Sequence, residues 1–324
     1  MAESYEYSIG SVRAKEKELL SSADIEAMLA CSDTKSLVNY LRDKGYAEGE
    51  TVDELIKNNR NETADYISHI VPDVSVFEIF SIVNDAHNIK AVIKGLLADV
   101  DYENLIITPN TIKPEDIETA VKEKRYSLLP EAFSQAAEKA YEVLAHTADA
   151  RLADAYIDIA CMKAQLKKAE ETKIDFLIEY FRTDIFYRNV KSALRGSKTL
   201  ADKEYFETAL IDGLEGFDKK EIIKAALNSV DALCDYLALK DRYKSALAVE
   251  AYKSSPATFE RFCDNLLNSL AIEKCKRAGS GAEAALGFYI ARLSEEKAIH
   301  IIAVGIETDS PAEITRERLR ELYG

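Results

Sequence analysis

The chain repeats a helical segment of its own sequence. Asn88–Gly95 aligns without a gap with Asn189–Gly196, at an offset of 189 − 88 = 101 residues. A fainter third copy, Ala298–Gly305, follows after a further 298 − 189 = 109 residues. Units of about 100 residues are longer than common solenoid repeats, so they could instead close around a pseudo-threefold axis. Chance similarity between amphipathic helices, which share their apolar spacing by necessity, is the alternative.

Helical periodicity runs along the whole chain. In the first copy the apolar residues Ile82, Ala86, Ile89, Ile93 and Leu96 advance by 4, 3, 4 and 3 positions, which is the spacing of one helical face. Only 12 glycines and 6 prolines interrupt 324 residues, and strand patterns are scarce. The sequence therefore predicts an all-α fold.

Several local signals place helix ends. Gly45 follows an apolar periodic segment as a C-terminal glycine does, and Pro114 precedes two acidic residues like a first-turn proline. Another helix is expected to start near Asp218. The Ser-Pro-Ala-Glu run at residues 310–313 reads as a capping box, which predicts a final helix that reaches about Leu322.

The chain is acidic, because 42 Lys and Arg against 57 Asp and Glu give a formal net charge of −15. Nucleic acid is therefore not expected as a partner, since that affinity comes largely from cations that neutralise phosphates. The five cysteines are scattered and form no C-x-x-C pair, which favours a reducing, cytosolic setting. Residues 1–10 lack the pattern of a secretory signal, and the longest apolar run, 298–306, is too short to span a bilayer.

Motifs for catalysis are almost absent. The chain has no phosphate-binding loop of the G-x-x-x-x-G-K-[ST] type, and the G-x-G-x-x-A match at residues 279–284 follows a charged segment instead of a buried strand. The histidines, His69, His87, His146 and His300, belong to no H-E-x-x-H motif. We therefore expect no cofactor, no metal and no catalytic residue.

Four cations recur at one helical phase of the first two copies: Lys90, Lys94, Lys191 and Arg195. One interpretation is a solvated helix face. The other is a ring of positive charge, brought together by the pseudosymmetry, that orients an acidic partner. These four residues are the candidate interface.

The sequence resembles the C subunit of the V-type and A-type rotary ATPases, the counterpart of the d subunit of the eukaryotic vacuolar enzyme. The segments that carry the resemblance are residues 5–20, Phe77–Gly95 and residues 296–319. The third segment departs from the family pattern, because Ala298-Ile299-His300 stands where Asn-Leu-Arg is expected.

The resemblance implies a multihelical funnel of three pseudo-symmetric parts, here residues 1–130, 131–241 and a shortened 242–324. It also implies a non-catalytic central-stalk component on the cytoplasmic face of the membrane. Its partners would be the D and F subunits of the shaft and the proteolipid ring, with ATP-linked transport of H⁺ or Na⁺ as the function of the complex. The chain itself would not span the membrane and would be monomeric when isolated.

Two other hypotheses remain open from the sequence. The chain could be a free-standing helical adaptor or scaffold for a protein partner. It could also be a helical enzyme whose site is assembled from dispersed carboxylates, although no motif supports this. The choice between H⁺ and Na⁺, and between ATP synthesis and hydrolysis, is not encoded in these patterns.

Overall fold

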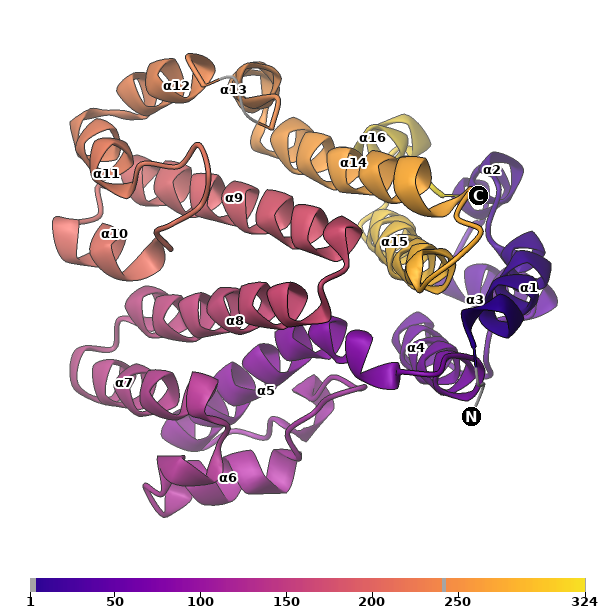
Figure 1. Cartoon of the computed structure of the whole chain (residues 1–324), viewed down its shortest axis with the longest axis horizontal. Helices are drawn as coiled ribbons and strands as arrows, with labels where there is room; N and C mark the ends of the chain where they lie inside the picture. Colours follow the sequence, from indigo (N-terminus) through magenta and orange to yellow (C-terminus); the bar gives the residue numbers. More distant parts are fainter. Residues whose placement is uncertain (1–3, 241–242, 324) are drawn as a thin grey trace. The chain divides into compact units, whose positions relative to one another are not determined.

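The computed structural model describes residues 4–240 and 243–323. In these ranges the regular structure is helical, with short 3₁₀ turns between some helices (Figure 1). The prediction of an all-α fold is confirmed. The chain forms two compact units: unit 1 contains Met1–Ser75 and Ala251–Gly324, and unit 2 contains Val76–Glu250. The division into residues 1–130, 131–241 and 242–324, which the repeat suggests, is not tested by these two units and stays a prediction.

Unit 1 combines helices from both ends of the chain. They are α1 (Tyr5–Lys15), α2 (Ser22–Leu29), α3 (Thr34–Asp43), α4 (Val52–Ile70), α14 (Pro256–Cys275), α15 (Glu283–Glu307) and α16 (Ala312–Arg318). Helix α15 lies at the centre and contacts α1, α3, α4, α14 and α16 (Figure 1). Because α15 is surrounded, it is apolar on several faces, and Ile299, Ile302 and Ala303 join the core that α2, α3 and α4 form with it.

A buried carboxylate ties two other segments of unit 1 to α15. Glu295 is 2% exposed and accepts hydrogen bonds from Arg292 Nη1 at 2.8 Å, from the Tyr46 hydroxyl at 2.8 Å and from the backbone N–H of Leu20. Arg292 is itself 7% exposed. A buried charge is tolerated only where such partners replace water, so this cluster fixes how the helices of unit 1 meet.

Asp24 is a second tightly bound carboxylate of unit 1. It completes a capping box with Ser21 at the start of α2 and also accepts from the Tyr40 hydroxyl at 2.7 Å and Lys44 Nζ at 2.5 Å. Burial alone would raise the pKa of Asp24. The hydrogen bonds from Lys44, Ser21 and Tyr40 outweigh burial and hold the pKa well below its usual range.

We predict that Asp24 makes the chain sensitive to acid. A carboxyl with a lowered pKa in the folded state contributes stability above its unfolded pKa of about 4 and loses it as the pH falls toward the folded value. Asp24→Asn should therefore lower the free energy of unfolding by about 1 kcal/mol at pH 7, and by less at pH 3. Urea unfolding at both pH values measures this, with exposed Asp65→Asn as the control. An equal loss at both pH values would contradict it.

The C-terminal helix differs from the sequence prediction. Helix α16 begins at Ala312 with Pro311 as its N-cap, has no side-chain cap, and ends at Arg318 instead of near Leu322. Ser310 belongs to the end of α15 instead, because its backbone N–H donates to Gly305 O at 2.9 Å and its hydroxyl lies 2.9 Å from Thr308 Oγ1. The predicted capping box was therefore wrong.

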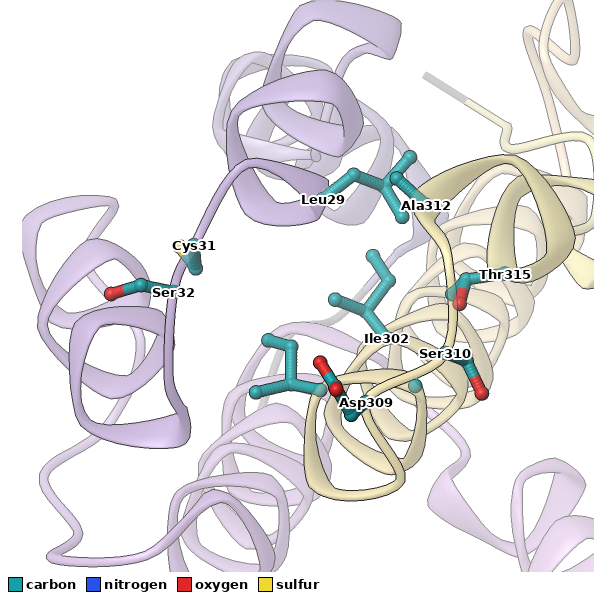
Figure 2. Close-up of a pocket in the computed structure, with 10 residues that line it drawn as sticks. Leu29, Cys31, Ser32, Ile302, Asp309, Ser310, Ala312 and Thr315 are labelled. Carbon is teal, nitrogen blue, oxygen red and sulfur yellow. The ribbon is translucent and has the colours of Figure 1, made fainter.

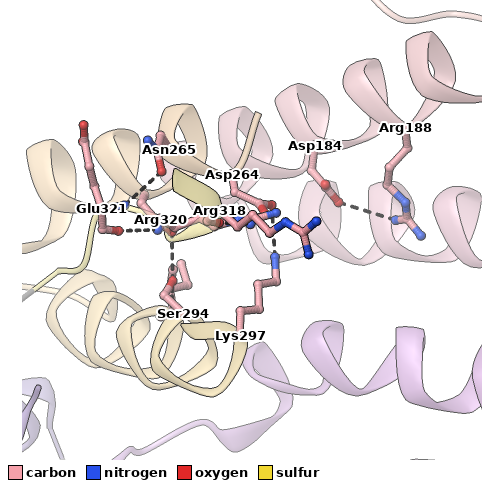
Figure 3. A network of polar contacts seen from close by, with 11 residues as sticks. Asp184, Arg188, Asp264, Asn265, Ser294, Lys297, Arg318, Arg320 and Glu321 are labelled. Atoms are coloured by element: carbon pink, nitrogen blue, oxygen red, sulfur yellow. Dashed lines mark hydrogen bonds and ion pairs between the residues drawn. The ribbon is translucent and has the colours of Figure 1, made fainter. Parts of the chain in front are cut away.

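The residues after α16 are extended and bind to α14. Asp264 of α14 pairs with Arg320 Nε at 2.8 Å and with Lys297 Nζ at 3.1 Å (Figure 3). Asn268 Nδ2 of the same helix donates to Glu321 O at 2.8 Å. Burial raises the pKa of Asp264, but the charges of Lys297 and Arg320 lower it more. These contacts satisfy the backbone of a segment that the sequence suggested would continue as helix.

Unit 2 contains the middle of the chain. Its helices are α5 (Glu78–Ala98), α6 (Pro114–Lys122), α7 (Glu131–Thr147), α8 (Ala150–Thr172), α9 (Asp175–Lys198), α10 (Lys203–Ala209), α11 (Lys219–Asn228) and α12 (Val230–Ala238), while α13 (Ser245–Ser254) crosses the division. Helix α8 contacts α5, α7, α9 and α10, and lies between α7 and α9 in Figure 1. The starts at Pro114 and after Asp218 are confirmed, whereas α10 was missed.

The helices α5, α9 and α15 end in the same way. The backbone N–H of the fifth residue after Gly95, Gly196 and Gly305 donates to the carbonyl of that glycine, at 3.0, 2.9 and 2.9 Å. The fourth residue after each glycine has a left-handed backbone, with φ of 52°, 53° and 50°. In each case the following segment packs so closely that a Cβ on the glycine would clash with Tyr102, with Tyr205 and Phe206, or with Thr315. This is the geometry of a Schellman C-cap, and it recurs at the sequence offsets of 101 and 109.

Two buried asparagines at equivalent positions also make equivalent contacts. Asn88 Nδ2 donates to Ile107 O at 3.0 Å, and Asn88 Oδ1 accepts from the backbone N–H of Ile107 at 2.8 Å. Asn189 binds the backbone of Ile211 in the same way, at 2.9 and 3.0 Å. Both asparagine side chains are 0% exposed. They supply hydrogen-bond partners to the backbone N–H and C=O of Ile107 and Ile211, which lie in non-helical connections after α5 and α9.

We predict that Asn189→Ala lowers the free energy of unfolding by about 2 kcal/mol, because the buried N–H and C=O of Ile211 lose both partners. Urea unfolding followed by circular dichroism measures the loss. Replacing exposed Asn228 by alanine serves as the control. A loss no larger than that of the control would show that water replaces the amide.

Candidate interface

The two candidate lysines of α5 are engaged by α8. Lys90 Nζ lies 2.7 Å from Asp158 Oδ1, and Lys94 Nζ lies 2.7 Å from Asp154 Oδ1. Residues four apart on one helix thus meet residues four apart on an antiparallel neighbour, which fixes the register of α5 against α8. Such partly exposed pairs add only about 0–1 kcal/mol each, but they neutralise much of the charge that α5 would present to a partner.

The two candidates on α9 lie in different surroundings. Lys191 is half-buried and Arg195 is exposed. Burial raises the pKa of nearby Tyr205, and the positive charges of Arg195 and Arg151 partly oppose that shift. Arg151 lies over the Tyr205 ring at 5.2 Å. Arg195 therefore belongs to a basic region at the end of α9.

The third copy carries little of this charge. At the offset of 109, Lys191 corresponds to 191 + 109 = 300, which is His300, and Arg195 corresponds to 195 + 109 = 304, which is Val304. The four candidates are thus placed in unit 2, two paired with carboxylates of α8 and two on α9. A single basic ring that uses all of them stays a prediction.

A groove that the sequence did not indicate lies in unit 1. It has a volume of about 580 Å³, lies between α3, the start of α4 and the end of α15, and has an apolar floor of Val38, Val52 and Ala303. Charges of both signs surround the floor: Lys35, Arg42, Glu50, Asp53 and Glu307. No sequence signal could have found it, because its walls come from residues about 250 positions apart.

A smaller pocket of about 110 Å³ lies between the segment that follows α2, the end of α15 and the turn from α15 into α16 (Figure 2). Leu29 and Ile302 face its interior, and Cys31, Asp309 and Ser310 stand around it. Within residues 4–240 and 243–323, no three His, Cys, Asp or Glu side chains come close enough together to hold a metal ion.

Helix α15 is the most buried long helix of unit 1, yet charged residues interrupt it. Across the part of the chain that the structure describes, no helix combines the length and the apolar character needed to cross a lipid bilayer.

Within each unit, ion pairs, buried amides and close glycine contacts hold the helix pairs and the helix ends. The profile of the family described as ATP synthase (C/AC39) subunit matches residues 8–318, which is nearly the whole chain. The chain belongs to this family, as the resemblance in its sequence indicated. A search among curated proteins found no match.

Proposed function

We propose that this chain is a non-catalytic central-stalk component of a V/A-type rotary ATPase. It couples the shaft made of the D and F subunits to the membrane proteolipid ring, so that ATP turnover elsewhere in the complex is linked to transport of H⁺ or Na⁺. It lies on the cytoplasmic face of the membrane and is held there by its partners. The observation that carries the proposal is the family match over residues 8–318.

The close packing of the helices supports a role in transmitting torque. A coupler must pass torque from one partner to the other without absorbing it in its own deformation. The closely packed glycines at the ends of α5, α9 and α15 leave those turns little room to move, and the pairs between α5 and α8 oppose sliding of one helix along the other.

The proposal is tested by recovering the tagged chain from detergent-solubilised membranes of its source and identifying what accompanies it by mass spectrometry. Recovery of the D and F subunits together with the proteolipid is expected. An untagged preparation controls for non-specific retention. Recovery of the chain alone, or with unrelated proteins, from fully extracted membranes would contradict the proposal and favour a free-standing adaptor.

A further inference from the structure

The turn between α9 and α10 presents an unusual residue to solvent. Leu200 is 90% exposed, the largest exposed fraction among the exposed large apolar side chains of the described residues. Its backbone is left-handed, with φ of 53°. Leucine costs free energy at this position for two reasons. Its apolar side chain stays in water, and in the left-handed conformation its Cβ lies too close to the following carbonyl oxygen.

The two equivalent turns carry a different residue at this position. Asp99 lies 101 residues before Leu200 and Asp309 lies 109 residues after it, and both are left-handed as well. Aspartate tolerates this backbone conformation better than leucine does. The fold therefore does not require leucine at this turn.

Cations surround Leu200 in an otherwise acidic chain. Arg195 and Lys198 lie in the last turn of α9, and Lys203 begins α10, all three exposed. Arg151 reaches the same turn, since its Nη1 donates to Thr199 Oγ1 at 3.0 Å.

The acids nearby offset only part of this charge. Asp149 lies 3.7 Å from Arg151, Asp202 caps the N-terminus of α10, and Glu204 lies in the first turn of that helix, so three acids stand against the four cations. An exposed apolar side chain within a group of cations matches an acidic surface that contains an apolar pocket.

We propose that Leu200, with Arg195, Lys198 and Lys203 around it, anchors this chain to an acidic protein surface in the rotary complex, where Leu200 enters an apolar pocket. The inference rests on the proposed function, because it places the partner in that complex. A protein surface fits better than an anionic membrane. One exposed leucine with a local excess of about one positive charge gives little affinity for an anionic membrane, where each cation adds about 1 kcal/mol, whereas a pocket in a protein can enclose the whole leucine side chain.

The test compares wild type with Leu200→Asn. Asparagine suits the left-handed backbone, so the variant should fold at least as stably as wild type, which a urea titration checks. Both proteins are titrated against immobilised rotary complex from which this chain has been removed. We expect Leu200→Asn to raise the Kd about tenfold or more. Lys198→Glu should also raise the Kd and weaken its dependence on salt.

Leu239→Asn is the matched control, because Leu239 is 86% exposed but its backbone is not left-handed. Equal Kd values for wild type and Leu200→Asn would overturn the inference, while wild-type binding would still support the proposed function. Absence of wild-type binding would contradict the proposed function and the inference with it. Binding that depends on Leu200 but occurs only on phosphatidylglycerol vesicles would overturn the inference in favour of a lipid surface.

Discussion

Gly196→Ala should lower the free energy of unfolding by about 2 kcal/mol, although alanine is the better helix former. A Cβ at this position would lie 2.6 Å from Phe206 Cε1 and 2.7 Å from Tyr205 Cε1. Both rings are buried, at 0% and 6% exposed, so neither can move without opening the contact between α9 and α10. Urea unfolding followed by circular dichroism measures the effect.

Gly10→Ala is the control for this prediction. Gly10 lies inside α1, and a Cβ there would meet no atom within 4 Å. The same substitution should therefore raise the free energy of unfolding by up to about 1 kcal/mol, through the lower chain entropy of the unfolded state. If both variants gained stability, the close packing at the end of α9 would not be the constraint that we infer.

Glu295→Ala should have the largest effect in unit 1, a loss of about 3–5 kcal/mol. Without this carboxylate, the Arg292 guanidinium remains buried without its charge partner, and the Tyr46 hydroxyl and the Leu20 N–H lose their acceptor. The same urea titration measures the loss.

The control for Glu295 is Glu142→Ala on α7, where the partner Lys139 is 3.0 Å away and both side chains are about half exposed. That substitution should leave the free energy of unfolding nearly unchanged, because exposed pairs gain little over water. Similar losses in the two variants would show that the buried cluster does not hold unit 1 together.

Much of the fold follows from local signals in the sequence. The spacing of Ile82, Ala86, Ile89 and Ile93 predicted α5, and Pro114 predicted the start of α6, because both depend only on nearby residues. The C-terminus could not be predicted in this way. There, Ser310 closes α15 and Asp264 holds the extended tail, and both contacts depend on tertiary packing.

The candidate interface was harder to predict than the fold. Periodicity showed that Lys90 and Lys94 share a face, but the carboxylates that meet them, Asp154 and Asp158, belong to a different helix, α8. Leu200 gave no signal either, since only the structure shows its left-handed backbone and its exposure. A pattern of residue types reports a helical face, whereas function depends on what covers that face.

The most direct test of the account is a coupling measurement on the rotary complex in sealed vesicles, prepared with and without this chain. ATP hydrolysis and ATP-driven ion uptake are recorded on the same vesicles. We predict that the complex without the chain still hydrolyses ATP but takes up no ions, and that adding the purified chain restores uptake. Ion uptake that is unchanged in the absence of the chain would contradict its role as the coupler.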